Sequence, residues 1–112
     1  MLSVRKVEEK DKKLIFDWGN DPDTRQFSGN SQILEWDTHV KWFKAKVNNP
    51  MNDKLFIILK DNTEVCLVRF EKKDNWSIGI TMSPEYRGLG LGFDCLRLGL
   101  EAFDQFFSTT LY

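Results

Sequence analysis

Three apolar segments joined by short polar turns limit what this chain can fold into more than any other feature of its sequence. Residues 55–59 and 65–70 are mostly continuous apolar runs, and residues 76–82 alternate strictly. Short runs and alternation of this kind are typical of β-strands. The turns between them, residues 60–63 and 72–75, are too short for a crossover and allow only hairpin connections. The sequence therefore predicts an antiparallel meander.

Helices and one further strand are predicted around this meander. Residues 34–47 and 91–106 repeat apolar side chains at helical spacing, and the polar stripe of the second segment is narrow enough to predict packing on more than one side. Residues 2–7 alternate weakly and predict a first strand. Residues 9–18 predict a charged helix with a narrow apolar stripe, which must end before Pro22.

A long, turn-rich connection follows that first helix, over residues 19–31. Connections of this length inside a small domain are usually functional or mobile. The whole chain of 112 residues is long enough for one domain. We expect a single α/β (α+β) domain over residues 1–112, with a mixed, mainly antiparallel sheet flanked by helices.

Charge and composition exclude several classes of protein. With 16 Lys and Arg residues against 17 Asp and Glu residues, the net charge of −1 gives no electrostatic reason to expect nucleic acid or an anionic membrane as the main partner. No apolar window is long enough for a membrane span, and charged Arg5 and Lys6 precede any signal-type apolar core, so we expect a cytoplasmic protein. Cys66 and Cys95 lack a partner motif, which favours buried thiols over a disulfide or a metal site.

The strongest functional signal lies between the last predicted strand and the last helix. Residues 87–92 read Arg-Gly-Leu-Gly-Leu-Gly. Backbone N–H groups at a helix start are unpaired and lie at the positive end of the helix dipole, and glycine removes side chains that would block a bulky anion. Arg87 adds a cation that suits a pyrophosphate. We therefore expect a phosphate group at this loop.

Two common phosphate loops do not fit these residues. A Walker loop is excluded because no lysine and hydroxyl residue follow Gly92. A Rossmann fingerprint is disfavoured because the glycine spacing is G-x-G-x-G and too few residues remain for the ribose-binding acid. A glycine-rich turn that serves only a tight connection stays open as the purely structural interpretation.

The strand before the glycine loop has one large and one small face. Large side chains occupy the even positions from Trp76 to Met82, whereas Ser77, Gly79 and Thr81 share the other face. The small face leaves room for a slender ligand chain against the sheet. Close packing of a helix on that face is the alternative.

These motifs resemble the GNAT superfamily of N-acetyltransferases. Residues 87–92 match its acetyl-CoA motif, R/Q-x-x-G-x-G/A, and the order of strand, two helices, three-stranded meander, glycine loop and helix is similar to that fold over nearly the whole chain. Residues 17–25 and 39–43 look like the branch that acetylates nucleotide-linked amino sugars in the pseudaminic-acid pathway. Ribosomal-protein and aminoglycoside acetyltransferases share a looser form of the W-x-N-D-P element at residues 18–22.

The resemblance implies that a small-molecule primary amine attacks the thioester of acetyl-CoA, the acetyl donor, without a metal. It also implies that residues 87–92 hold the pyrophosphate, that the backbone of residues 80–82 pairs with the pantetheine arm, and that the Met82 N–H stabilises the oxyanion. The implied acetyl-CoA-binding residues are Ile80, Thr81, Met82, Arg87, Gly88, Leu89, Gly90, Leu91 and Gly92.

The proton acceptor departs from the family pattern. Many members place a glutamate on this strand, where the chain has Ser77, which is too weakly basic to act alone. A water relay or His39 would have to substitute, so the base stays unassigned. The candidate catalytic residues are Met82, His39 and Ser77. An ordinary, partly exposed histidine is the alternative for His39.

Candidate acceptor-binding residues cluster around the long connection. They are Trp18, Asn20, Arg25, Asn30, His39 and Trp42. The two tryptophans could stack on a sugar or a base, or belong to the core. The asparagines and Arg25 could contact a nucleotide diphosphate or a sugar, or cap turns.

The resemblance also predicts a C-terminally short domain. The family continues past the glycine-loop helix with a strand, a tyrosine-bearing helix and a final strand, none of which fits in residues 107–112. We expect a homodimer in which a second copy covers the uncovered sheet edge. Two other functions stay open: a protein N-terminal acetyltransferase of the ribosomal-protein type, and a non-catalytic acyl-CoA-binding module.

Overall fold

A four-stranded antiparallel sheet with strand order β1-β2-β3-β4 forms the centre of the molecule. The computed structural model describes residues 1–21, 34–49 and 51–111, with the side chains up to residue 105. The strands are β1 (Leu2–Lys6), β2 (Asp53–Lys60), β3 (Thr63–Lys72) and β4 (Trp76–Met82). The predicted first strand and meander are confirmed. Each strand pairs with the strand that follows it along the chain.

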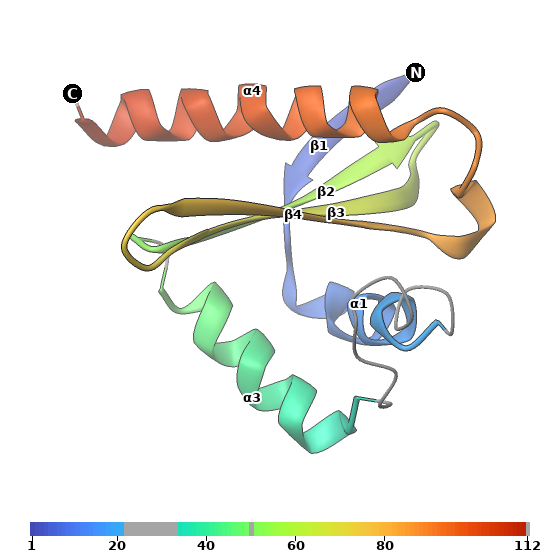
Figure 1. Ribbon diagram of the computed structural model, residues 1–112, viewed down its shortest axis with the longest axis horizontal. Helices are drawn as coiled ribbons and strands as arrows, with labels where there is room; N and C mark the ends of the chain where they lie inside the picture. The colour runs from blue at the N-terminus through green and yellow to red at the C-terminus, as the bar shows by residue number, and fades with distance from the viewer. Residues whose placement is uncertain (22–33, 50, 112) are drawn as a thin grey trace.

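Helices cover both faces of the sheet, as Figure 1 shows with the sheet almost edge-on. The helix α4 (Gly92–Leu111) lies on one face, and α1 (Lys12–Gly19) and α3 (Trp36–Val47) lie on the other. A short 3-10 turn, Glu9–Asp11, precedes α1 within the predicted helix. The helix α3 begins two residues after its predicted start, and α4 begins one residue after its predicted start and extends beyond residue 106.

Each face of the sheet has its own hydrophobic core. The core under α4 contains Phe56, Ile58, Val65, Cys66, Val68, Phe70 and Cys95. The core under α1 and α3 contains Ile15, Trp18, Phe43, Leu55, Ile57 and Leu67. The alternation of side chains along β2 and β3 divides their apolar residues between the two cores. Both faces of these strands are covered, which explains why their sequences read as continuous apolar runs.

A glycine allows α4 to approach the sheet closely. A Cβ atom on Gly99 would lie 2.8 Å from Val68 Cγ1 and 3.1 Å from its Cβ. No larger residue fits there without moving the helix or the strand. The contact fixes the distance between α4 and β3, and with it the position of the N-terminal end of α4.

A buried carboxylate fastens the start of α1 to β1. Asp11 is 2% exposed, and its two oxygens accept hydrogen bonds from Arg5 Nη1 at 2.7 Å and Arg5 Nη2 at 2.9 Å. The Glu8 N–H donates to the same carboxylate at 2.7 Å. Burial opposes the charged form, but the Arg5 and Glu8 hydrogen bonds outweigh it and lower the pKa of Asp11.

The described helices include none that is long and apolar enough to cross a membrane. The predicted long connection falls almost wholly outside the described residues, and so do two of its candidate acceptor-binding residues, Arg25 and Asn30.

Candidate functional site

The outer edge of β4 presents backbone groups that β3 does not use. In the described sheet β4 is the last strand, and β3 is its neighbour. The Ser83 N–H, just after the strand, donates to Val65 O at 2.8 Å, and the register continues regularly from there. Since alternate residues of an antiparallel strand face the partner, Ser77, Gly79 and Thr81 point their backbone groups at β3. Those of Ile78, Ile80 and Met82 point away from it.

The loop after β4 exposes further amide groups. Gly88 has φ +78° and Gly90 has φ +75°, a left-handed conformation that a side chain disfavours. A Cβ atom added at Gly88, Gly90 or Gly92 would meet no atom within 4 Å. The first helical hydrogen bond of α4 runs from the Cys95 N–H to Leu91 O at 2.9 Å, which leaves the N–H groups just before it without a helical acceptor. The loop therefore fits a bulky anion.

Arg87 is tied to the end of α1. Its Nη1 donates to Asp21 Oδ2 at 2.7 Å, and both side chains are partly exposed. The predicted loop cation is therefore already paired with a carboxylate. A pyrophosphate at this loop would have to share Arg87 with Asp21, or displace Asp21.

His39 lies between α1 and α3, where the residue is 5% exposed. It stacks on Trp42 at 5.6 Å between ring centroids and packs against Phe16 and Phe43. Its Nε2 lies 2.8 Å from Lys12 O, and because a carbonyl can only accept, Nε2 carries the proton. Burial lowers the pKa of His39, and the Lys12 carbonyl only partly offsets that effect. The alternative of a partly exposed histidine is wrong, since the ring is buried.

The three candidate catalytic residues are not brought together. The aromatic and hydrogen-bonding neighbours of His39 belong to α1 and α3. Ser77 is exposed, and its hydroxyl donates to Glu71 O at 3.2 Å. Met82 packs against the core under α4, whereas the odd-numbered Ser77 projects from the opposite face of β4.

The described acceptor-binding candidates have structural contacts of their own. Trp18 is buried in the core under α1 and α3, at 5% exposure. Asn20 accepts from the Leu34 N–H at 2.6 Å and donates to Leu34 O at 3.2 Å, which joins the end of α1 to the segment before α3. Trp42 is half-buried against His39. These contacts favour the structural interpretation of Trp18 and Asn20.

Sequence reasoning missed Arg69, which occupies the small face of β4. Arg69 lies opposite Gly79 in the register, and its Nη2 is 2.6 Å from the place of a Cβ atom on Gly79. We expected either open space for a ligand chain or a closely packed helix on this face. At Gly79 the guanidinium of Arg69 occupies the space instead. The signal was present as a single arginine in an apolar run, but its importance depends on the pairing register.

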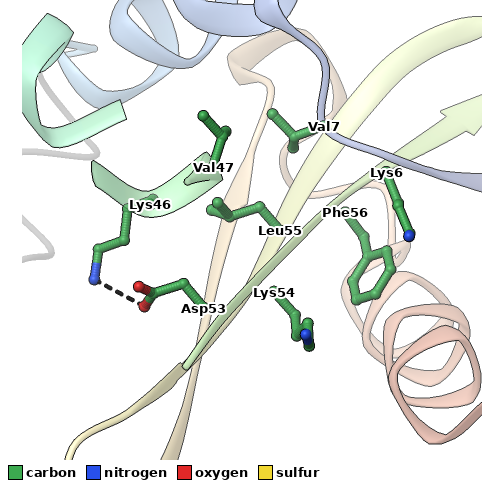
Figure 2. A pocket seen from close by; sticks show the side chains of 8 residues that line it. All are labelled: Lys6, Val7, Lys46, Val47, Asp53, Lys54, Leu55 and Phe56. Carbon is green, nitrogen blue, oxygen red and sulfur yellow. Dashed lines mark hydrogen bonds and ion pairs between the residues drawn. The ribbon is translucent and has the colours of Figure 1, made fainter. Parts of the chain in front are cut away.

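A small pocket of about 110 Å³ lies near β1 and β2, away from β4, and Figure 2 shows the side chains that line it. Its walls come from the end of β1, the start of β2 and the end of α3. The lining residues are Lys6, Val7, Lys46, Val47, Asp53, Lys54, Leu55 and Phe56, and Lys46 Nζ pairs with Asp53 Oδ1 at 3.1 Å. No residue of β4 or of the glycine loop lines it, so it does not belong to the candidate site. In the described part of the chain no cluster of side chains could hold a metal ion.

Comparison with known proteins agrees with this architecture. The sequence model of the acetyltransferase (GNAT) domain family matches residues 2–111. No curated protein sequence matches the chain. A solved domain from Methanocaldococcus jannaschii superposes with a TM-score of 0.76 at 23% identity, covering 95% of this chain and 71% of that one.

Two further solved structures that resemble the chain contain bound ligands. A spermidine N-acetyltransferase from Vibrio cholerae, in complex with CoA and spermine, superposes with a TM-score of 0.74 at 16% identity and covers 89% of this chain. An aminoglycoside acetyltransferase in complex with coenzyme A gives 0.76 at 14% identity and covers 94% of this chain. The present chain spans 62% of the former and 68% of the latter. At these identities the likeness establishes the fold.

Proposed function

Because the chain belongs to the acetyltransferase (GNAT) domain family, we propose that it transfers an acetyl group from acetyl-CoA to a primary amine. One observation supports the proposal most strongly: the exposed backbone groups on the outer edge of β4 and those of the glycine loop follow one another along the chain. The outward-facing groups of Ile80 and Met82 lead directly into the glycine loop and the open N-terminal end of α4. A thioester with a long polar arm and a pyrophosphate matches that succession of donors.

Residues of this chain would bind the acetyl donor at three places. The amides of residues 88–92 would bind the pyrophosphate, with Arg87 beside them once Asp21 shares or releases it. The outward-facing backbone groups of Ile80 and Met82 would align the pantetheine arm, whereas the backbone of Thr81, which the resemblance also implied, faces β3 and would not. The Met82 N–H, directed to the open edge of β4, would donate to the carbonyl oxygen on which negative charge develops.

Bound acetyl-CoA supplies an activated acetyl group, which passes from sulfur to nitrogen as the C–N bond forms and the C–S bond breaks. Positioning and desolvation would supply most of the acceleration. The amine loses a proton, and neither Ser77 nor the buried His39 is placed to remove it directly from an amine at Met82. Ser77 lies five positions from Met82 and projects from the opposite face of β4, so we propose that bound water passes that proton to solvent or to the departing CoA thiolate.

We propose that the acceptor is a small molecule, the primary amine of a nucleotide-linked amino sugar. We further propose that the enzyme is cytoplasmic and that its single domain spans residues 1–112. The resemblance of residues 17–25 and 39–43 to that branch supports the acceptor. A protein N-terminal amine and non-catalytic acyl-CoA binding are the competing functions. Peptide and UDP-amino-sugar acceptors offered side by side separate the first two, and acetyl-CoA binding without release of free CoA would identify the third.

The binding site for acetyl-CoA can be tested with a matched pair of variants at Gly92. The position has open space for a side chain, and an acidic residue at a helix N-terminus is favourable. Gly92→Asp should therefore fold, yet its charge should repel the pyrophosphate and weaken acetyl-CoA binding by about tenfold or more. Gly92→Asn has the same shape without the charge and should bind more tightly than Gly92→Asp. Titration calorimetry measures both.

Equal affinities of the two Gly92 variants would contradict a pyrophosphate at the loop. Absence of acetyl-CoA binding by the unmodified protein at high micromolar concentration would end the proposed function altogether.

A further inference from the structure

Arg69 holds a positive charge over the middle of the edge strand. It lies on β3 opposite Gly79, on the face of the sheet that α1 and α3 cover. Its Nη2 and Nε lie 2.6 Å and 3.0 Å from the place where a Cβ atom of residue 79 would be. Any residue larger than glycine would displace the guanidinium. Gly79 and Arg69 together fix a cation on β4, close to the proposed reaction site.

The hydrogen-bonding capacity of this guanidinium is underused in the described structure. Its ion pair runs from Nη1 to Glu71 Oε1 at the long distance of 3.5 Å. Glu71 pairs more closely with Lys46, at 2.5 Å, and Lys46 also pairs with Asp53. Among the described residues, the buried Arg69 Nε–H has no acceptor. A buried donor without a partner is unfavourable, so an acceptor oxygen from a ligand would be stabilised there.

The location suits one end of an acceptor molecule. Arg69 is 32% exposed, so solvent reaches the guanidinium. Gly79 precedes Met82 by three residues, which places the two about 10 Å apart along the strand. A molecule whose amine reaches Met82 could therefore extend its other end toward Arg69. The nearby charges of Lys46, Asp53 and Glu71 are already engaged with one another.

We propose that Arg69 determines acceptor specificity by binding an anionic group, a carboxylate or phosphate, at the end of the acceptor remote from its amine. This inference rests on the proposed acetyl transfer and deepens it. The planar guanidinium suits the two oxygens of such a group. It also disfavours acceptors that are cations at both ends, because the second ammonium would lie beside Arg69.

Three acceptors of equal chain length test the proposal: 8-aminooctanoate, 8-aminooctanamide and 1,8-diaminooctane. They differ in a remote group that is anionic, neutral or cationic. Release of free CoA is followed with a thiol reagent at saturating acetyl-CoA. We expect kcat/KM to be highest for the carboxylate, by about tenfold over the amide, and lowest for the diamine. In Arg69→Gln, the carboxylate should lose at least that tenfold advantage over the amide.

The matched control is Arg97→Gln, because Arg97 is an exposed arginine on α4 that pairs with Glu101 at 3.1 Å. It should leave the order of the three acceptors unchanged. Should Arg69→Gln fail to give a folded circular dichroism spectrum, Arg69→Lys keeps the charge but not the planar fork. It should then reduce the carboxylate preference. Gly79→Ala, which displaces the guanidinium without removing it, should do the same.

Other results overturn the inference. Equal kcat/KM values for 8-aminooctanoate and 8-aminooctanamide in the unmodified protein would contradict it. A preference for the carboxylate that persists in Arg69→Gln would contradict it as well. Calorimetry could show that acetyl-CoA binds while no acceptor turns over. In that case NMR compares the equilibrium binding of 8-aminooctanoate and 8-aminooctanamide to the CoA-loaded protein. Equal binding of the two, or no binding of either, would overturn the inference. Failure of acetyl-CoA itself to bind would instead remove the proposed function on which the inference depends.

Discussion

At the scale of single residues, some polar side chains that the sequence suggested for the site make contacts within the fold. His39 and Asn20 both looked functional because each is a polar residue near the long connection that the sequence predicts. In the structure both side chains pair with partly buried backbone groups, His39 with Lys12 O and Asn20 with Leu34. Such contacts depend on how α1 and α3 pack, which local sequence patterns do not specify. Arg69 was overlooked for the opposite reason, since its importance appears only once Gly79 is known to lie opposite it.

The burial of His39 predicts how stability responds to acid. Its pKa in the folded protein lies below the ordinary value of 6.5, so the unfolded chain takes up the proton first as the pH falls. The stabilisation is fully present above that value and is lost as the pH falls below it, by up to about 1.4 kcal/mol per pH unit. Urea unfolding at about pH 7.5 and about pH 5.5 measures the loss.

His39→Phe should remove most of this pH dependence, because the chain has a single histidine. Trp42→Phe changes a neighbouring ring and should keep the dependence. The explanation would be refuted by an equal loss of stability in His39→Phe over the same interval.

At the scale of elements, the meander was predictable because its turns are too short for any other connection. The β2–β3 turn confirms this: Asp61 and Asn62 adopt φ values of 50° and 68°, as tight hairpins require. The positions of helices against the sheet were less predictable. The sequence indicates that α4 is apolar on several sides, but the close approach at Gly99 depends on Val68, thirty-one positions earlier in the chain.

The packing of α4 can be tested at that contact. Gly99→Ala should destabilise the protein by about 1–3 kcal/mol, because its Cβ would overlap Val68 Cγ1, even though alanine favours helix. Val68→Ala alone should also destabilise, by leaving a cavity. The double variant should be more stable than the sum of the two losses predicts. Denaturant unfolding of the four proteins gives this coupling, and strict additivity would show that Gly99 is not limited by Val68.

At the scale of the whole molecule, the described sheet ends at β4 with apolar side chains in contact with solvent. Ile78 is 49% exposed and Ile80 is 38% exposed, although they lie on the same face of β4 as Trp76 and Met82, and Leu100 of α4 is 41% exposed. Exposed apolar groups beside an edge strand favour association. We therefore propose that a second copy of the chain covers this region.

Sedimentation analysis tests the dimer. The unmodified protein should associate in a concentration-dependent manner, and Ile78→Lys should shift it to monomer with little loss of stability, since Ile78 is already half exposed. Val47→Lys, at the end of α3, introduces the same charge at another exposed position and should leave association unchanged. A monomer at every concentration, or loss of association in both variants, would contradict the proposed interface.

The geometry of β4 has one more consequence. Even-numbered residues send backbone groups outward and side chains to the face that carries α4, whereas odd-numbered residues turn their backbone to β3 and their side chains to the face on which Arg69 lies. Saturation mutagenesis across positions 77–82 should therefore yield phenotypes that change with a period of two. Polar or charged replacements at the even positions Ile80 and Met82 should alter the use of the thioester, and replacements at odd positions should alter which amines are accepted. One short stretch of polypeptide would then encode two separable properties, interleaved residue by residue.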